Sequence, residues 1–421
     1  MISARALRIP LTRLRRSRRD REWLAATLQM LIPALRDVDV KVEFGNPIYA
    51  AGANGIGQAV LEETRRLIEN GLDASAEPNA EYLADGITES IINTLSQLSH
   101  LRVMARSTVF HYKGLEVDPQ VVGRALGVSA VLVGRILSYD ERLIIRAELV
   151  DVKGGWAVWG AQFNRKSSDI LEVQEEIAWE IAYNLRIKLT SHVQELLTKR
   201  YTEHTEAYRL YLRGRFFWNK YTREAVEKGI EYFQQAIEHD PNYALAYAGL
   251  ADAYHRLSNL YLPPSEALPK ARAAAVKAVE LDDLLAEAHA SFGLLKMYYD
   301  HDWEGTEREY KRAIELHPGN AMSHKRYGEY LMYNRRFDEA LEEHKLSLKL
   351  DPLSLQGNIN LGTTLFLMRE YEQSIRQIKK TVELDPGNCP AHMALGQVTV
   401  TPQIGGLVPP DGRRYATPCQ L

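Results

Sequence analysis

The pattern of apolar and polar positions between residues 72 and 190 predicts a small domain of helices and strands. Helical spacing predicts helices over 81–98, 118–127 and 170–189, the second of them capped by Asp118. Strand-like spacing predicts strands over 101–107, 129–139, 141–152 and 155–165. The order α-β-α-β-β-β-α indicates an α+β domain with a mixed sheet and covering helices.

Two further patterns precede this domain. Residues 37–44 read DVDVKVEF and place Val38 and Phe44 on the same face of a predicted half-buried strand. Gly52, Gly55 and Gly57 then precede a predicted helix, where glycines could let the backbone approach a pyrophosphate. The spacing is G-x-x-G-x-G and a polar loop, not a strand, follows the helix. We favour a helix-start turn and keep a nucleotide-binding enzyme as a distant alternative.

From about residue 204 the pattern changes to paired helices with a fixed period. Pro318, Pro352 and Pro386 stand 34 residues apart, and each closes nearly the same phrase. Small residues also return at fixed places, since Gly328 and Ala340 correspond to glycine and serine one period later. Positions where two antiparallel helices approach closely require such small side chains. The sequence therefore predicts a stack of helix pairs.

This motif resembles the tetratricopeptide repeat. The resemblance covers 204–397, with five units and the opening of a sixth, and implies an all-α tetratricopeptide-repeat solenoid. Unit one has three extra residues and unit two about eight, around Pro263 and Pro264. We expect a longer loop between the two helices of unit two to absorb its insertion.

In the tetratricopeptide family the first helix of each unit lines a concave groove. The groove candidates that the resemblance implies are Tyr211, Arg215, Trp218, Asp252, Arg256, Met297, Tyr298, Lys325, Glu329, Met332, Tyr333, Ile359 and Phe366, and the same frame includes Tyr208, Glu287, Met322 and Leu367. Apolar and aromatic side chains are mixed with charges of both signs, which suits a helix or extended peptide with apolar anchors. The alternative for each residue is packing between neighbouring units.

A second resemblance covers about 72–190. YLADGITESIINTLSQL, ALGVSAVLVGRI and AELVDVKGGWAVWGAQFNR occur in the order of the TolB-like amino-terminal (FlgO-type) domain. That domain commonly precedes tetratricopeptide repeats in bacterial signalling proteins. Family members begin with an apolar strand where this chain has RRLIENG. Either the sheet lacks one strand or residues 38–44 are recruited in its place, and we favour the second. A shortened or rearranged gene product would explain the missing kinase, DNA-binding or cyclase domain of such proteins.

Charge and composition narrow the partners. The net charge is −3, but eight arginines and one aspartate fall in the first 21 residues, which leaves about −10 on the rest. This predicts no nucleic-acid binding by the body of the chain. No window of eighteen apolar residues predicts a transmembrane segment. The apolar run over 23–35 is expected to form a short amphipathic helix rather than a signal peptide.

Catalytic chemistry leaves no signature in the sequence. The two cysteines, Cys389 and Cys419, lack C-x-x-C spacing, and no nucleophile elbow, phosphate loop or kinase loop is present. The triplet Asp300-His301-Asp302 is predicted to be a solvated loop rather than a metal site. We therefore predict no enzyme, no cofactor and no metal.

These observations predict a domain order and a function. The segments are a basic arm with a short helix (1–36), a strand-turn-helix (37–71), a TolB-like domain (72–190), a linker helix (191–203), the repeats (204–397) and an irregular tail (398–421). The expected function is a scaffold that binds a protein or peptide partner in a bacterial signalling or envelope-associated assembly. The alternative is the regulatory portion of a regulator, kinase or cyclase that has lost its effector. A cytoplasmic location is favoured and a periplasmic one follows from family resemblance. The oligomeric state and the partner are left open.

Overall fold

The computed structural model of this protein describes residues 78–98, 101–115, 117–139, 142–187, 189–220 and 222–400 of the 421. The predicted strand over 37–44 and the glycine turn over 52–57 lie outside these residues. The first described elements are α3 (Pro78–Ser96), α4 (Arg106–Phe110), α5 (Pro119–Leu126), β1 (Ala130–Tyr139), β2 (Arg142–Asp151), β3 (Ala157–Lys166) and α6 (Ile170–Asn184). Helix α5 begins at the predicted cap, because the Asp118 carboxylate accepts the Gln120 N–H at 2.8 Å.

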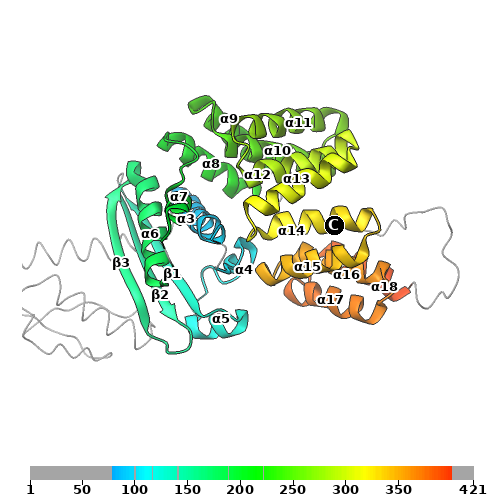
Figure 1. Cartoon of the computed structure of the whole chain (residues 1–421), viewed down its shortest axis with the longest axis horizontal. Helices are drawn as coiled ribbons and strands as arrows, with labels where there is room; N and C mark the ends of the chain where they lie inside the picture. Colours follow the sequence, from blue (N-terminus) through cyan, green and yellow to red (C-terminus); the bar gives the residue numbers. More distant parts are fainter. Residues whose placement is uncertain are drawn as a thin grey trace, which may run out of the picture. The chain divides into compact units, whose positions relative to one another are not determined.

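The sheet of the described residues has three strands in the order β1-β2-β3 and is antiparallel throughout. Ile145 on β2 pairs with Ile136 on β1 and with Phe163 on β3. These positions pack on α3 and α6, and Figure 1 shows both helices beside the sheet. The three predicted strands over 129–165 are thus present, whereas a mixed sheet is not found among the described residues.

The strand predicted over 101–107 was wrong. Residues 101–105 belong to no strand, and α4 begins at Arg106. The reason is the hydrogen-bond partner, because the Ala105 N–H donates to the carbonyl of Leu350 at 2.8 Å. Leu350 closes a helix of the repeats. An extended segment with alternating apolar residues has here paired with a repeat instead of with a sheet edge.

The rest of the described chain is helical. It consists of α7 (Ser191–Thr198), α8 (Thr205–Trp218), α9 (Arg223–His239), α10 (Ala244–Leu260), α11 (Pro264–Leu281), α12 (Ala286–Leu295), α13 (Trp303–Leu316), α14 (Ala321–Tyr333), α15 (Phe337–Leu350), α16 (Leu355–Leu367), α17 (Tyr371–Leu384) and α18 (Cys389–Val400). From α8 onward these helices contact one another in successive pairs, which Figure 1 shows as a stack. The pairs α8–α9 to α16–α17 are units one to five, and α18 opens the sixth.

Close helix crossings explain the small residues that recur in the period. Ala340 on α15 is fully buried. A Cβ added at Gly328 on α14 would lie 2.5 Å from the ring of His344 on α15, so any larger residue there would force the two helices apart. The period of the sequence therefore reflects the geometry of helix pairing.

The insertion in unit two lengthens its helices instead of its loop, which corrects our expectation. Helices α10 and α11 have 17 and 18 residues, whereas α14 and α15 of the regular unit four have 13 and 14. Three residues join the two helices in both units. Pro264 occupies the first turn of α11, where proline costs no hydrogen bond, so the Pro-Pro pair starts a helix instead of marking a long loop.

One hydrophobic core joins the sheet to the first repeat. Buried residues of α3, α6 and the sheet pack in the same cluster as Leu212 of α8 and Tyr243 at the start of α10. The two parts of the described chain therefore share an apolar core, in addition to the polar contacts described next.

Candidate functional site

The structure places the thirteen predicted groove residues in three kinds of surroundings. Trp218, Met297 and Ile359 are buried, at 5%, 4% and 8% exposure, and pack within the stack of helices. A side chain with so little exposure offers little surface to a partner.

A second group makes polar contacts inside the molecule. Asp252 accepts a hydrogen bond from Ser291 at 2.8 Å and pairs with Arg326 of unit four at 2.9 Å. Arg256 lies 4.0 Å above the ring of Trp218 and donates to the Trp218 carbonyl. Tyr211 packs against the rings of Phe233 and Tyr243, and Arg215 pairs with Glu89 of α3.

The third group lies in units three to five and is partly open. Tyr333 is 53% exposed, and Met322 and Leu367 of the same frame are also exposed. Lys325, Glu329, Met332 and Phe366 are half-buried, and Tyr298 packs against the ring of His255. Burial raises the pKa of the Glu329 carboxyl. Apolar surface therefore remains accessible on the first helices of units four and five.

Helix α3 contacts residues of unit one at and beside its predicted groove positions. The Glu89 carboxylate accepts from Nε of Arg215 at 3.0 Å, and the side chain of Leu212 fills the space beside Gly86. Tyr208 shares hydrogen bonds with Ser90 of α3 and Gln174 of α6, and burial raises its pKa to about 12. The array thus already holds a helix of its own chain on its first unit.

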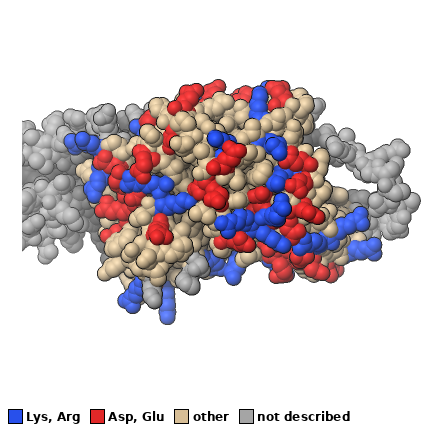
Figure 2. Space-filling view, turned by 45° about the horizontal axis from the view of Figure 1, so that its top comes forward, with Lys and Arg blue, Asp and Glu red and all other residues tan. Residues whose placement is uncertain are grey.

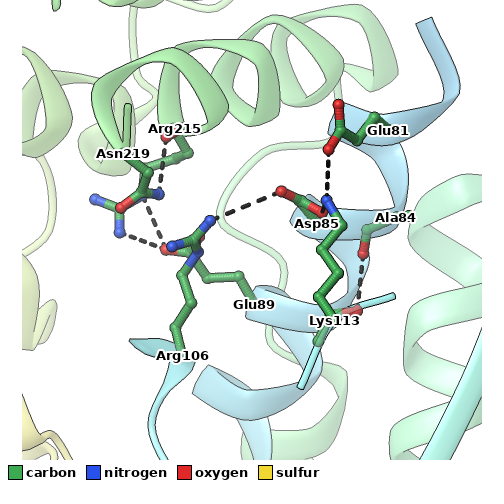
Figure 3. A network of polar contacts seen from close by, with 9 residues as sticks. Glu81, Ala84, Asp85, Glu89, Arg106, Lys113, Arg215 and Asn219 are labelled. Atoms are coloured by element: carbon green, nitrogen blue, oxygen red, sulfur yellow. Dashed lines mark hydrogen bonds and ion pairs between the residues drawn. The ribbon is translucent and has the colours of Figure 1, made fainter. Parts of the chain in front are cut away.

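A chain of ion pairs, shown in Figure 3, continues from α3 to α4. Arg106 of α4 lies 3.1 Å from Glu89 and 3.8 Å from Asp85, and Lys113 lies 2.6 Å from Asp85 and 2.7 Å from Glu81. Burial raises the pKa of the Asp85 carboxyl, although Lys113 opposes the shift. Burial also opposes the charge of Arg215, but Glu89 holds the pKa of that guanidinium above its usual range.

The inter-repeat turns form a second contact surface. Asp240, Asp282, His317 and Asp351 each stand just after the second helix of a unit, and we call these four residues the turn row. Each of them contacts the chain upstream of the repeats. Thr202 donates to Asp240 at 2.5 Å, Lys199 pairs with Asp282 at 3.2 Å, and Ser96 lies 2.8 Å from Nε2 of His317. The spacing of the turns therefore matches contact points on the upstream segment.

The fourth contact is the most extensive. The Asp351 carboxylate accepts from Ser107 and, at 3.1 and 2.8 Å, from the amide and hydroxyl of Thr108. The Thr108 hydroxyl accepts from the amide of Leu353 at 3.0 Å. Together with the bond from Ala105 to Leu350, we call these contacts the α4 latch.

The latch supplies a cap that α4 lacks. The N-cap residue Ala105 has no side-chain oxygen, and the Asp351 carboxylate accepts the Thr108 amide in its place. At Asp240, Asp282 and Asp385 the carboxylate instead bonds the amide two residues ahead in its own turn. At Asp351 the Thr108 hydroxyl is inserted into that turn, because it binds both Asp351 and Leu353.

Asp385 provides the contrast, because it has the same place in unit five. Its oxygens bond the Gly387 amide at 3.1 Å and the Asn388 side chain at 3.3 Å, both within its own turn. Among the described residues it makes no polar contact with the upstream segment. The turn row thus ends at unit four.

Metal and membrane features are absent from the part of the chain that the structure describes. No group of three or more metal-ligating side chains occurs there, and no helix is long and apolar enough to cross a bilayer. In the Asp300-His301-Asp302 triplet, Asp300 pairs with Arg272, and Asp302 caps α13 through the Gly305 amide. Figure 2 shows acidic and basic side chains interspersed on the face in view.

The 34-residue period, the helix pairs and the tight crossings define an array of tetratricopeptide-type repeats joined to a small three-stranded unit. No protein-family model matches the chain. It is 36% identical over 177 residues to a protein named putative adenylate cyclase 3 from Rhizobium meliloti, which covers 42% of this chain and 30% of that protein. It is 29% identical over 134 residues to the transcriptional regulator HilA of Salmonella typhimurium, with 32% and 24% covered. The matches thus span less than a third of these relatives.

Solved structures of tetratricopeptide proteins are also similar. YrrB, a TPR protein with an unusual peptide-binding site, is 19% identical and has a TM-score of 0.30, with 45% of this chain and 91% of that chain covered. TTC0263, a thermophilic TPR protein from Thermus thermophilus, is 15% identical, with a TM-score of 0.38 and 44% and 96% covered.

Sequence reasoning missed the turn row and the α4 latch. The residues of the turn row stand just before the end of each repeat period, yet nothing local marks them as contact points. Ser107 is the last residue of the strand predicted over 101–107, Thr108 follows it directly, and neither has a local signal of a capping partner.

Proposed function

We propose that the chain is a non-catalytic scaffold that binds a helix or extended peptide of a partner protein on units four and five. The observation that carries this proposal is α3 on unit one. There the first helix of a repeat binds a helix through an ion pair, a leucine and a tyrosine hydroxyl. The corresponding positions of units four and five keep exposed apolar side chains, Met322, Tyr333 and Leu367, beside Lys325 and Glu329.

The chemistry of this open surface specifies the partner's features. Apolar anchors would pack on Tyr333, Met332 and Phe366, while a carboxylate of the partner would suit Lys325. Met322 and Leu367 extend the same surface. Ile359 is buried, so we assign it to packing beneath this surface and not to partner contacts. A bacterial signalling or envelope-associated assembly is the setting that we infer, since both relatives reported above are bacterial.

The experiment is affinity capture with the full chain, followed by mass spectrometry. The double variant Tyr333→Ala, Phe366→Ala should lose the captured partner while its helical circular dichroism is unchanged. Tyr183→Ala is the matched control, because Tyr183 is equally exposed but lies on α6, away from the repeats. Partner capture that survives the double variant would contradict the proposal.

A second candidate is the regulatory portion of a larger regulator or cyclase. The partial matches to proteins named putative adenylate cyclase 3 and transcriptional regulator HilA favour it, because each of these relatives extends well beyond the stretch that it shares with this chain. Placed behind a DNA-binding domain in a reporter strain, the chain should change transcription, and Tyr333→Ala with Phe366→Ala should abolish the change. Reporter transcription that is the same with and without the chain would exclude this candidate.

The distant alternative of a nucleotide-binding enzyme involves Gly52, Gly55 and Gly57, outside the described residues. We expect calorimetric titration with NAD(P) and ATP to show no binding. Saturable binding that Gly55→Trp abolishes would revive this alternative.

A further inference from the structure

A cavity of about 80 Å³ lies where α3, α6, α8 and the starts of α10 and α12 meet. Four tyrosines line it, Tyr201, Tyr208, Tyr211 and Tyr243, together with the carboxylates of Glu89 and Glu287. A cavity of this volume holds about two to three water molecules at about 30 Å³ each, or one small organic molecule. It lies at the junction of the three-stranded unit and the repeats, a place where small-molecule sites are often found.

The Tyr243 hydroxyl is an orphan in this cavity. The side chain is 0% exposed, and its hydroxyl has no hydrogen-bond partner among the described residues. Burial is the main cause that raises the pKa of Tyr243 well above its usual value. The nearby hydroxyls of Tyr211 and Tyr208 raise it further, so the three hydroxyls lie close to one another. A buried hydroxyl without a partner is destabilising, and a bound polar group would offset this cost.

One carboxylate of the cavity lacks a charged partner, although the lining holds three cations and three carboxylates, because Lys199 pairs with Asp282 outside the lining. Glu89 pairs with Arg215, and Glu175 pairs with Arg200. Among the described residues, the only ion-pair neighbour of Glu287 is His317, whose Nδ1 lies 3.9 Å from the carboxylate. Burial lowers the pKa of His317, so this imidazole is neutral at pH 7 and does not compensate the carboxylate. Burial and the Glu287 carboxylate also raise the pKa of the Tyr201 phenol, which places that carboxylate near the tyrosine hydroxyls.

We propose that this cavity binds a small organic ammonium compound with a hydroxyl group, an amino alcohol. Its ammonium group would pair with Glu287 among the tyrosine rings, since cations are favoured beside carboxylates and aromatic faces. Its hydroxyl would bond the orphan Tyr243 hydroxyl. Such a site is separate from the open surface of units four and five and stands whether or not that surface binds a peptide. It would stabilise the junction, because a ligand that binds only the assembled junction favours it.

The experiment is calorimetric titration of the full chain with ethanolamine, with ethylamine lacking the hydroxyl, and with ethylene glycol lacking the charge. We expect ethanolamine to bind more tightly than ethylamine and ethylene glycol not to bind. Glu287→Gln should weaken ethanolamine at least tenfold, whereas Glu315→Gln on the exposed face of α13 should leave it unchanged. Circular dichroism would verify that both variants fold.

Tyr243→Phe separates a ligand site from a cavity that holds only water. In the ligand-free chain it should raise the melting temperature, because it removes an unpaired buried hydroxyl. It should reduce ethanolamine affinity several-fold and leave ethylamine affinity unchanged. Absence of binding for both amines, equal binding of ethylene glycol, or full ethanolamine affinity in Glu287→Gln would each overturn the proposal.

Discussion

The first three repeats and the last two differ in what their surfaces do. Units one to three vary in helix length, and their first helices and turns contact α3, the linker and one another. Units four and five are regular, and their first helices expose Tyr333 and Leu367. Asp351, at the end of unit four, is the last residue of the turn row. The array therefore uses part of its surface for contacts within the chain and leaves another part exposed.

The irregular units differ from the regular ones in helix length but form the same kind of helix pair. Added residues in unit two lengthen both helices, so their ends extend beyond those of a regular unit. The regular units keep the common helix length and leave the groove positions open. Regular helix lengths accompany the exposed first-helix surface that we propose for partners, whereas the upstream segment contacts turns of irregular units and also of the regular unit four, at Asp351.

The largest expected effect on stability tests whether Asp252 serves contacts within the chain and not partner binding. Asp252→Ala leaves the buried guanidinium of Arg326 without its partner, and we expect a loss of about 3 to 5 kcal/mol in the free energy of unfolding. The double variant Asp252→Ala, Arg326→Met should recover most of this loss, because both charges are gone. Urea denaturation measures both. A single variant as stable as the parent would place Asp252 among free groove residues instead.

The pH dependence of stability provides the next test, which uses one buried histidine of an irregular unit and one of a regular unit. Burial lowers the pKa of His255 in unit two and of His344 in unit four to about 4, from 6.5. Between pH 6.5 and 4 the unfolded chain binds more protons, so the stability present above pH 6.5 is lost as pH falls. Each histidine contributes about 3 kcal/mol to that loss.

Replacing either histidine by leucine should reduce the slope of unfolding free energy against pH over this range. His255→Leu and His344→Leu serve as controls for each other, because the pKa shift has the same cause and size in both. A slope that only one of the two variants changes would show that the two parts unfold separately. Urea denaturation at several pH values provides the slopes.

The smallest expected effect comes from two aspartates, Asp351 and Asp385, that stand at the same position of units four and five. Asp351→Ala removes the acceptor of Ser107 and Thr108, and we expect a loss of about 1 to 3 kcal/mol. Asp385→Ala removes only bonds within its own turn, and about 0.5 to 1 kcal/mol should be lost. Chemical denaturation of the two variants side by side measures the difference. Equal losses would mean that the α4 latch adds nothing to stability.

Much of the repeat fold could be predicted from the sequence because its constraints are local and recur. Gly328 and Ala340 are small because two helices cross there, and that requirement returns every period. The strands β1 to β3 were predicted because consecutive strands pair across short turns. The cap at Asp118 is also a contact between near neighbours in the chain.

The rest depended on contacts between residues far apart in sequence. The segment before α4 has the apolar alternation of a strand, but its Ala105 amide pairs with Leu350, which no local pattern identifies. The groove frame assigns Arg215 to the groove face of its helix, and only the tertiary structure shows that Arg215 pairs with Glu89 of α3. The resemblance to a TolB-like domain stays a prediction, as do the domain boundaries and the thirteen groove residues.

The α4 latch, in which Asp351 of unit four caps α4, makes the local opening of this region measurable by hydrogen exchange. A helix of five residues is too short to persist alone in water, so α4 should be helical only while Asp351 holds its first turn. Hydrogen exchange at the Thr108 amide then reports how often that end of the molecule opens, because this residue is fully buried and its amide donates to Asp351 in the closed state. The native chain thus contains its own probe of local opening, and the protection factor converts directly into an opening free energy without any substitution.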